Sequence, residues 1–365
     1  MSILEATQAP FVTLHALQAF PPSVLNRDDN HTVKQIVYGG TPRVRVSSGA
    51  CKRAIRVAMR EAAISGGHYG LRTTRFPALI TDILVSQYRR AADEAVAKVA
   101  TVFGSLKLKA GKAGKTSAPI FASPRFAAAT AAAIDANWDR IGGEAPANVT
   151  AAARAALDVH DTVDLALFGR MLAEIPGTRV DGAAGVSHSF SVDPACIEPD
   201  FWSMVDDAAG DGDTASSNLG ESTLAAPVLY RSAYLDRRQL RFNLSAAADP
   251  DQLAATAERY FVEWFVRAVP TAKKRSSVAW TLPSLVVATC GDQVLSGAAA
   301  FSVPISGTQV LATASAALLA SLARADEIVG DQVHVVLSTD PGVDAIVDGP
   351  HHTRLSDFID GISRQ

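Results

Sequence analysis

A run of basic side chains near the start of the chain is the pattern with the clearest chemical use. Between positions 43 and 60 the sequence carries six basic residues and no acidic one. They are Arg43, Arg45, Lys52, Arg53, Arg56 and Arg60. Arg43 and Arg45 are two residues apart, so they share one face of a predicted strand. Lys52, Arg56 and Arg60 are four residues apart, so they form a stripe along the predicted helix that follows.

Ser47 and Ser48 lie between this strand and this helix. Either serine can cap the helix, and the unpaired N–H groups of a helix start attract anions. The residues therefore predict a corner that binds phosphate groups. A solvated basic surface, with arginines paired to nearby aspartates, is the alternative that residue types alone leave open. The missing acidic partners favour phosphate binding, whereas the formal net charge of −3 gives it no general support.

The surrounding sequence predicts one sheet with helices packed on it. Apolar residues alternate at Val12, Leu14 and Ala16, as in a half-buried strand. The other predicted strands lie near residues 43–46, 163–167, 180–192, 227–235, 284–290 and 333–337. Helices are predicted after Ser48, within residues 66–160, and from Asp249 to about Phe265. This order of strands and helices indicates an α+β fold.

Composition is that of a folded chain with a sizeable core. Hydrophobic residues make up 48% of the chain. Its length of 365 residues is above the usual size of a single domain, which predicts one large domain with insertions or two domains. Three cysteines lie far apart and predict reduced thiols in a cytoplasmic protein. They are Cys51, Cys196 and Cys290.

The stretch between Asp292 and Arg324 carries no charged residue. Glycine and proline interrupt it, and polar residues are scattered through it, so it is a poor membrane span. We expect a loop or strand there, followed by a buried helix from about Thr308 to Ala323.

Other motifs with known chemistry are incomplete. The sequence from Gly111 to Thr116 resembles a phosphate-binding P-loop, but Lys109 stands where the first glycine is required. The stretch that begins at Asp211 lacks the glycine and the glutamate that a calcium loop needs. No nucleophile, metal or cofactor motif supports a small-molecule enzyme. We therefore expect no catalytic residue, no metal and no cofactor.

Several blocks, in this order along the chain, closely resemble the CasC family. This family comprises the Cas-seven-type backbone subunits of the type I-E CRISPR Cascade complex. The blocks are Leu17–Asp29, Tyr38–Gly40, Arg43–Ser48 with Lys52–Arg56, Phe168–Met171, Val180–Ala183, Val205–Asp207, Leu229–Arg231 and Val269–Arg275. The first block is the most specific, and together the blocks span most of the chain.

The resemblance implies a modified RRM-like (ferredoxin-like) palm with two additions. The palm would be discontinuous, over residues 1–65 and 161–365. A helical fingers insertion would occupy residues 66–160, and a thumb hairpin within the palm would occupy residues 188–229.

The implied function is that of a CRISPR RNA (crRNA) binding backbone subunit in antiviral defence. Copies of the chain would polymerise along the guide RNA in a helical filament and present it to target DNA. The implied partners are crRNA, further copies of the chain, other Cascade subunits and, through the guide, target DNA. The resemblance implies a cytoplasmic protein that is not an enzyme and does not contact a membrane.

The resemblance also implies which residues contact RNA. They are Asn26, Arg27, Arg43, Arg45, Ser47, Ser48, Gly49, Lys52, Arg53, Arg56, Arg170, Met171, Lys274 and Arg275. Met171 matches the family's wedge beside a displaced nucleotide, and an apolar side chain can fill such a gap without reading sequence. Gly49 departs from the family pattern, which has Gln at this position.

The predicted thumb is acidic, which keeps a second function open. No Lys or Arg occurs from Val180 through Tyr230, against nine acidic residues. Such a hairpin cannot hold RNA by charge. Backbone subunits of type III complexes use a thumb aspartate and a metal to cut RNA, so a metal-dependent endoribonuclease is the alternative.

Overall fold

The computed structural model of the chain describes residues 8–62, 69–108, 114–159, 161–172, 175, 177–204, 218–270, 272–330 and 332–365. The chain divides into two compact units. The first unit takes Met1–Glu61, Gly185–Leu235 and Glu258–Gln365. The second unit takes Ala62–Ala184 and Asp236–Ala257. Within the described residues the fold is α+β, as predicted.

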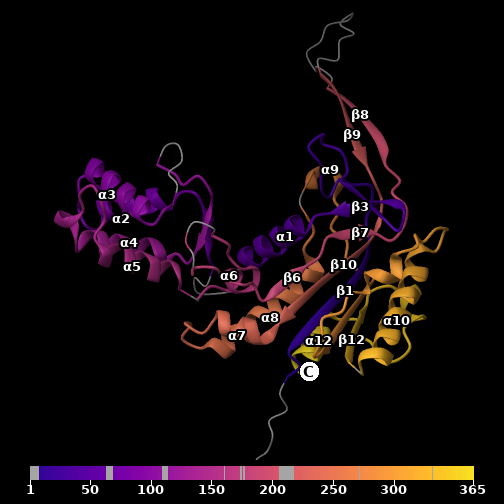
Figure 1. Cartoon of the computed structure of the whole chain (residues 1–365). Coiled ribbons are helices and arrows are strands. Elements are labelled where there is room, and N and C mark those ends of the chain that lie inside the picture. The colour runs from indigo at the N-terminus through magenta and orange to yellow at the C-terminus, as the bar shows by residue number, and fades with distance from the viewer. Residues whose placement is uncertain are drawn as a thin grey trace, which may run out of the picture. The chain divides into compact units, whose positions relative to one another are not determined.

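One sheet runs through the first unit (Figure 1). Its strand order in the described residues is β12-β11-β1-β10-β7-β3-β2, and β6 also pairs with β10. The strands are β1 (Phe11–Ala19), β2 (Gln35–Tyr38), β3 (Thr41–Val46), β6 (Ala184–Val186), β7 (Ser189–Ser191), β10 (Val228–Asp236), β11 (Leu285–Gly291) and β12 (Val333–Ser338). β1 runs antiparallel to β11, from Phe11 opposite Gly291 to Leu17 opposite Leu285. β11 lies inside the sheet between β12 and β1, which agrees with its unbroken apolar sequence, buried from Leu285 to Cys290.

The first unit also contains helices, several of which pack on the sheet. They are α1 (Ser48–Glu61), the C-terminal part of α8 (Pro250–Arg267), α9 (Lys274–Ser277), α10 (Val310–Val329), α11 (Pro341–Asp344), α12 (Leu355–Ser363) and the 3-10 turn η2 (Gly297–Phe301). α10 lies on one side of the sheet (Figure 1). Together with η2 it covers a core that includes Leu17, Tyr230 and Phe301. Thus the charge-free stretch contributes a core helix, as expected. No helix within the described residues is long and apolar enough to cross a membrane.

The β2–β3 hairpin turns at two glycines with positive φ. Gly39 and Gly40 have φ values of +59° and +74°, which is left-handed backbone that suits a tight hairpin turn. Gly39 also has no room for a side chain, because an ideal Cβ there would lie 1.5 Å from the carbonyl oxygen of Ser302. The turn therefore requires glycine at position 39 for two independent reasons.

The second unit is mainly helical. Its elements are β4 (Leu71–Thr73), α2 (Phe76–Ser86), α3 (Ala92–Ser105), β5 (Ile120–Ala122), α4 (Arg125–Asp135), η1 (Trp138–Arg140), α5 (Ala147–Leu157), α6 (Val163–Phe168) and α7 (Arg237–Asn243). Phe76 and Phe126 meet edge to face in its core, with ring centroids 5.0 Å apart. α4 and α5 are rich in alanine and pack against each other.

The strand predicted near residues 163–167 is wrong, because these residues form α6. Apolar residues alternate there, but the intervening positions are buried too, so the alternation does not mark one exposed face. Asp164 is buried, and its carboxylate accepts a hydrogen bond from the backbone N–H of Gly70 at 2.7 Å, which offsets the cost of burying the charge. In the sequence, Asp164 therefore resembled an exposed polar position of a strand, although it is a buried carboxylate with a hydrogen-bond donor.

A separate two-stranded hairpin belongs to the first unit. It consists of β8 (Glu198–Met204) and β9 (Asn218–Leu224), paired antiparallel from Glu198 opposite Leu224 to Met204 opposite Asn218. Every residue of β8 is exposed. The hairpin lies within residues 188–229, where the thumb was predicted, and residues 205–217 lie outside the described part.

Candidate nucleic-acid interface

The start of α1 is fixed by a serine and an asparagine. The hydroxyl of Ser47 accepts a hydrogen bond from the backbone N–H of Ala50 at 3.3 Å, which confirms the predicted serine cap. The backbone N–H of Ser47 donates in turn to Oδ1 of Asn26 at 2.9 Å. Asn26 therefore ties the loop before β2 to the corner between β3 and α1.

The two faces of α1 differ in chemistry. Cys51, Ile55 and Met59 are buried against the first unit, at the spacing of one helix face. The basic side chains lie on the remaining surface, with Lys52 and Arg56 half-buried and Arg53 exposed. α1 holds no acidic residue before Glu61 at its end. The predicted basic stripe is therefore a surface feature of a well-anchored helix.

His188 joins β3 to the start of α1. Its Nδ1 lies 3.0 Å from Nη1 of Arg45 and 3.3 Å from the backbone nitrogen of Ser48. Both neighbours are donors, so Nδ1 is the acceptor and the neutral ring carries its proton on Nε2. Sequence reasoning missed His188, because it lies 140 residues from Ser48 and belongs to no motif.

Gly49 leaves open space at the first turn of α1. An ideal Cβ at this position meets no atom within 4 Å. The glycine is therefore not required by packing, and backbone can be approached closely at a helix start whose N–H groups attract anions.

Arg27, which follows Asn26 in the sequence, lies at the start of a hydrogen-bonded turn. The carboxylate of Asp28 accepts hydrogen bonds from Thr32 Oγ1 at 2.8 Å and from the backbone N–H groups of Thr32 and Asn30 at 2.9 and 3.0 Å. The bond from the Thr32 side chain is the main cause that lowers the pKa of Asp28 below its usual value. Asp28 therefore serves a turn, and Arg27 is exposed at its start.

The structure corrects the prediction for Arg43, whose side chain is fully buried. Its guanidinium donates to the carbonyl oxygens of Ser191 and Val192, both at 2.8 Å, and of Phe301 at 3.0 Å. The sequence correctly placed Arg43 and Arg45 on one face of β3, but Arg43 is buried there and only Arg45 is partly exposed. Arg43 ties β3 to the chain after β7 and to η2, so we leave it out of the candidate interface.

Arg170 is likewise enclosed, within the second unit. Its guanidinium donates to the carbonyl oxygens of Thr178 and Leu157, both at 2.8 Å, and of Phe121 at 3.2 Å. Burial lowers the pKa of Arg170 to about 10, and the nearby carboxylate of Asp158 opposes this shift. Arg170 is therefore also left out of the interface.

Two further predicted positions differ in exposure. Met171 follows Arg170 in the second unit and is 82% exposed, as a wedge residue would be. Arg275 lies exposed on α9 in the first unit. The side chain of Lys274, its neighbour on α9, lies outside the described residues.

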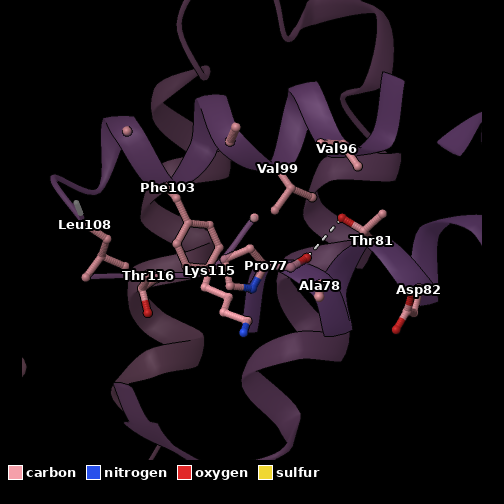
Figure 2. A pocket seen from close by; sticks show the side chains of 13 residues that line it. Pro77, Ala78, Thr81, Asp82, Val96, Val99, Phe103, Leu108, Lys115 and Thr116 are labelled. Atoms are coloured by element: carbon pink, nitrogen blue, oxygen red, sulfur yellow. Dashed lines mark hydrogen bonds between the residues drawn. The ribbon is translucent and has the colours of Figure 1, made fainter. Parts of the chain in front are cut away.

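A hollow in the second unit is apolar. Figure 2 shows the space between α2 and α3, with a volume of about 600 Å³. Val99 and Phe103 line it, and Lys115 lies at its side (Figure 2). Asp82 also contributes to the lining but points away from Lys115 (Figure 2). The hollow therefore brings together no pair of groups suited to acid–base chemistry.

Metal-ligating side chains do not gather within the described part of the chain. No group of three or more His, Cys, Asp or Glu residues there is placed to hold a metal ion. The centres of the P-loop-like and calcium-loop-like sequences, residues 111–113 and 211–217, lie outside the described residues.

Known proteins resemble the chain over nearly its whole length. A family model described as "CT1975-like protein" matches residues 12–355. A chain of a solved structure described as "CRISPR RNA-guided surveillance complex, pre-nicking" is 29% identical, with a TM-score of 0.85, and the match covers 97% of this chain and 99% of that one. A second, described as "CRISPR RNA-guided surveillance complex", is 25% identical, with a TM-score of 0.63 and coverages of 97% and 98%. No curated protein sequence matches the chain.

Proposed function

Because the chain belongs to the CT1975-like protein family, we propose that it is a crRNA-binding backbone subunit of a CRISPR RNA-guided surveillance complex of the Cascade type. The full-length similarity to a chain of such a complex, at a TM-score of 0.85, is the observation that carries the proposal. The N-terminal blocks that resemble CasC favour type I-E within this class.

The basic face of α1 supplies the physical basis for RNA binding. Lys52, Arg53 and Arg56 project from a helix whose inner face is buried, and no acidic residue on the helix competes for them before its last position. Phosphates are the groups such a surface binds, without reading bases. The guide bases then stay free to pair with target DNA.

The two units differ in their bounds from the palm and fingers that the resemblance implies, because residues 161–184 and 236–257 belong to the second unit. We assign the sheet of the first unit to the RRM-like palm, the helical second unit to the fingers and the β8–β9 hairpin to the thumb. The hairpin presents apolar side chains among acidic ones, since Phe201 is 76% and Leu219 is 73% exposed. It would therefore engage RNA or a neighbouring subunit by apolar contact.

The proposed setting is a cytoplasmic ribonucleoprotein. Its partners are crRNA, further copies of the chain in a filament, other Cascade subunits and target DNA through the guide. We propose that the chain has no catalytic role of its own, and that cleavage belongs to other components.

Charge reversal on α1 tests the proposal. Affinity of the full chain for single-stranded RNA should fall by about 0.7 log units per log unit of salt for each phosphate contacted. Lys52→Glu and Arg56→Glu should weaken binding and prevent assembly on a co-expressed guide. Arg354→Glu, which makes the same charge change at an exposed position before α12, is the matched control.

Two results would contradict the proposal. One is unchanged assembly of both α1 variants, with melting curves that show them folded. The other is regularly spaced cleavage of complementary RNA in magnesium, lost on replacing one hairpin aspartate, which would favour the endoribonuclease.

A further inference from the structure

An extended segment after α9 displays apolar side chains to solvent. Val278, Trp280 and Leu282 are 68%, 54% and 56% exposed, while the intervening Ala279 is buried. Alternation of this kind puts one set of side chains inward and the other outward. We call Val278, Trp280 and Leu282 the outer strip.

A buried arginine network anchors this segment to the sheet. Arg231 on β10 donates through Nη1 to the side-chain oxygen of Gln18. Its Nη2 donates to the carbonyl oxygens of Phe265 at 2.6 Å and Ala268 at 3.2 Å. Gln18 Nε2 then donates to the carbonyl oxygen of Thr281 at 2.6 Å. Hydrogen bonds through Gln18 and Arg231 therefore join the segment that carries the outer strip to β1 and β10.

Thr281 is bound from both directions. Its hydroxyl donates to the carbonyl oxygen of Ala19 at 2.8 Å, at the end of β1. Trp280 and Leu282 flank this residue, so neither can turn inward without breaking these bonds. The backbone therefore holds the large apolar ring of Trp280 at the surface.

Backbone geometry beside the strip is strained. Val278 has a φ of +46°, although β-branched residues strongly avoid the left-handed region. Lys273, just before α9, has a φ of +45°. Strain of this kind persists where surrounding contacts enforce it, and it clusters at binding sites.

The sequence that leads into the strip is positively charged. Lys273, Lys274 and Arg275 precede it, and no acidic residue occurs between Pro270 and Ser284. The cations of this stretch are therefore close in sequence to Trp280.

We propose that Trp280 is a stacking platform for an unpaired base of the guide RNA. An aromatic face beside cations suits a single strand, because the ring stacks on a base while the cations bind the adjacent phosphates. Three side chains are too small a patch for a stable protein interface, which needs about 800 Å² per partner. The inference rests on the proposed function and adds to it a base contact that α1 does not supply.

Paired RNA probes test the inference with the full chain. We compare a short oligoadenylate with a ribose-phosphate strand of equal length that lacks bases. Trp280→Ala should weaken binding of oligoadenylate roughly 5- to 150-fold, the range expected for one stacked base, and leave binding of the abasic strand unchanged. Trp280→Phe, which keeps an aromatic face, should stay near the wild-type affinity. Val37→Ala, at a 68% exposed apolar position on β2, is the control.

The outcomes separate this inference from the proposed function. Equal losses on both strands, or no loss with Trp280→Ala, would overturn the stacking role while Lys52→Glu still weakened binding to both. Unchanged RNA binding with smaller assemblies in sedimentation would make the strip a protein contact and also overturn it. If the wild-type chain bound neither strand, the proposed function would fail as well.

Discussion

Arg43 allows a residue that stabilises the fold to be separated from one that binds RNA. We expect Arg43→Met to destabilise the first unit and to leave the salt dependence of RNA binding unchanged. Methionine fills much of the same volume but donates no hydrogen bond. The carbonyl groups of Ser191 and Phe301 therefore lose the donor that Arg43 supplies. The carbonyl group of Val192 keeps a hydrogen bond from the backbone N–H of Ile305 at 2.9 Å.

The size of the effect follows from the two acceptors that lose this donor. A buried acceptor left without a partner costs roughly 1–3 kcal/mol. Carbonyl oxygens have a second lone pair, so we take the lower part of the range and expect the free energy of unfolding to fall by about 2–4 kcal/mol. With an unfolding entropy of about 2.1 cal/mol/K per residue over 365 residues, Tm should fall by about 3–5 °C.

Two measurements on each of two variants decide the matter. Denaturant titration gives the free energy of unfolding, and binding to single-stranded RNA at several salt concentrations gives the salt slope. Arg53→Met, an exposed position on α1, should change stability by less than about 0.5 kcal/mol and reduce the slope by about 0.7. If Arg43→Met kept its stability and lost slope instead, Arg43 would face RNA and the reasoning from its burial would be refuted.

Three other predictions concern the turn, the helix start and a buried histidine. Gly39→Ala should destabilise the first unit by roughly 2 kcal/mol or more, because the new methyl group would collide with the Ser302 carbonyl oxygen. Gly40→Ala has open space and should cost only about 1 kcal/mol for its positive φ. Equal losses of stability for the two variants in thermal melts would contradict this. Gly49→Gln introduces the residue that the CasC family has at this position, and it has open space there, so Tm should stay the same or rise. A fall in the free energy of unfolding above about 1 kcal/mol would show that the space is not open. Burial lowers the pKa of His15 from 6.5 to about 4, so the folded state holds fewer protons and stability is lost as pH falls from 6.5 toward 4. Relative to His15→Gln, the wild type should lose about 2 kcal/mol between pH 7.5 and 5 in denaturant titrations, and parallel pH profiles would refute the buried neutral ring.

Local patterns predicted the parts of the site that depend on local contacts. The serine cap of α1 follows from the residue type and its place before the helix, and it is confirmed. The family resemblance is confirmed as well, by a family model that matches residues 12–355. The cap could be predicted because its partner, the N–H of Ala50, lies three residues from Ser47.

Burial by distant segments could not be read from spacing. Arg43 is enclosed by carbonyl groups 148 and more residues away, and no local pattern distinguishes it from Arg45. Trp280 was missed although its signal is present, since apolar residues alternate directly after a basic triplet. Whether such an alternation faces outward depends on Arg231 and Gln18, which are remote in sequence.

The strand order of the sheet has a consequence for synthesis of the chain. β1 lies between β10 and β11, so its neighbours emerge from the ribosome only after about 200 further residues. At roughly 5–20 residues per second, the apolar residues of β1 wait about 10–40 s for a partner. The helical core of the second unit, within residues 76–175, can form from nearer contacts in that interval. The first strand to be made is therefore among the last to be completed, and chaperone protection during translation should matter most for this N-terminal segment.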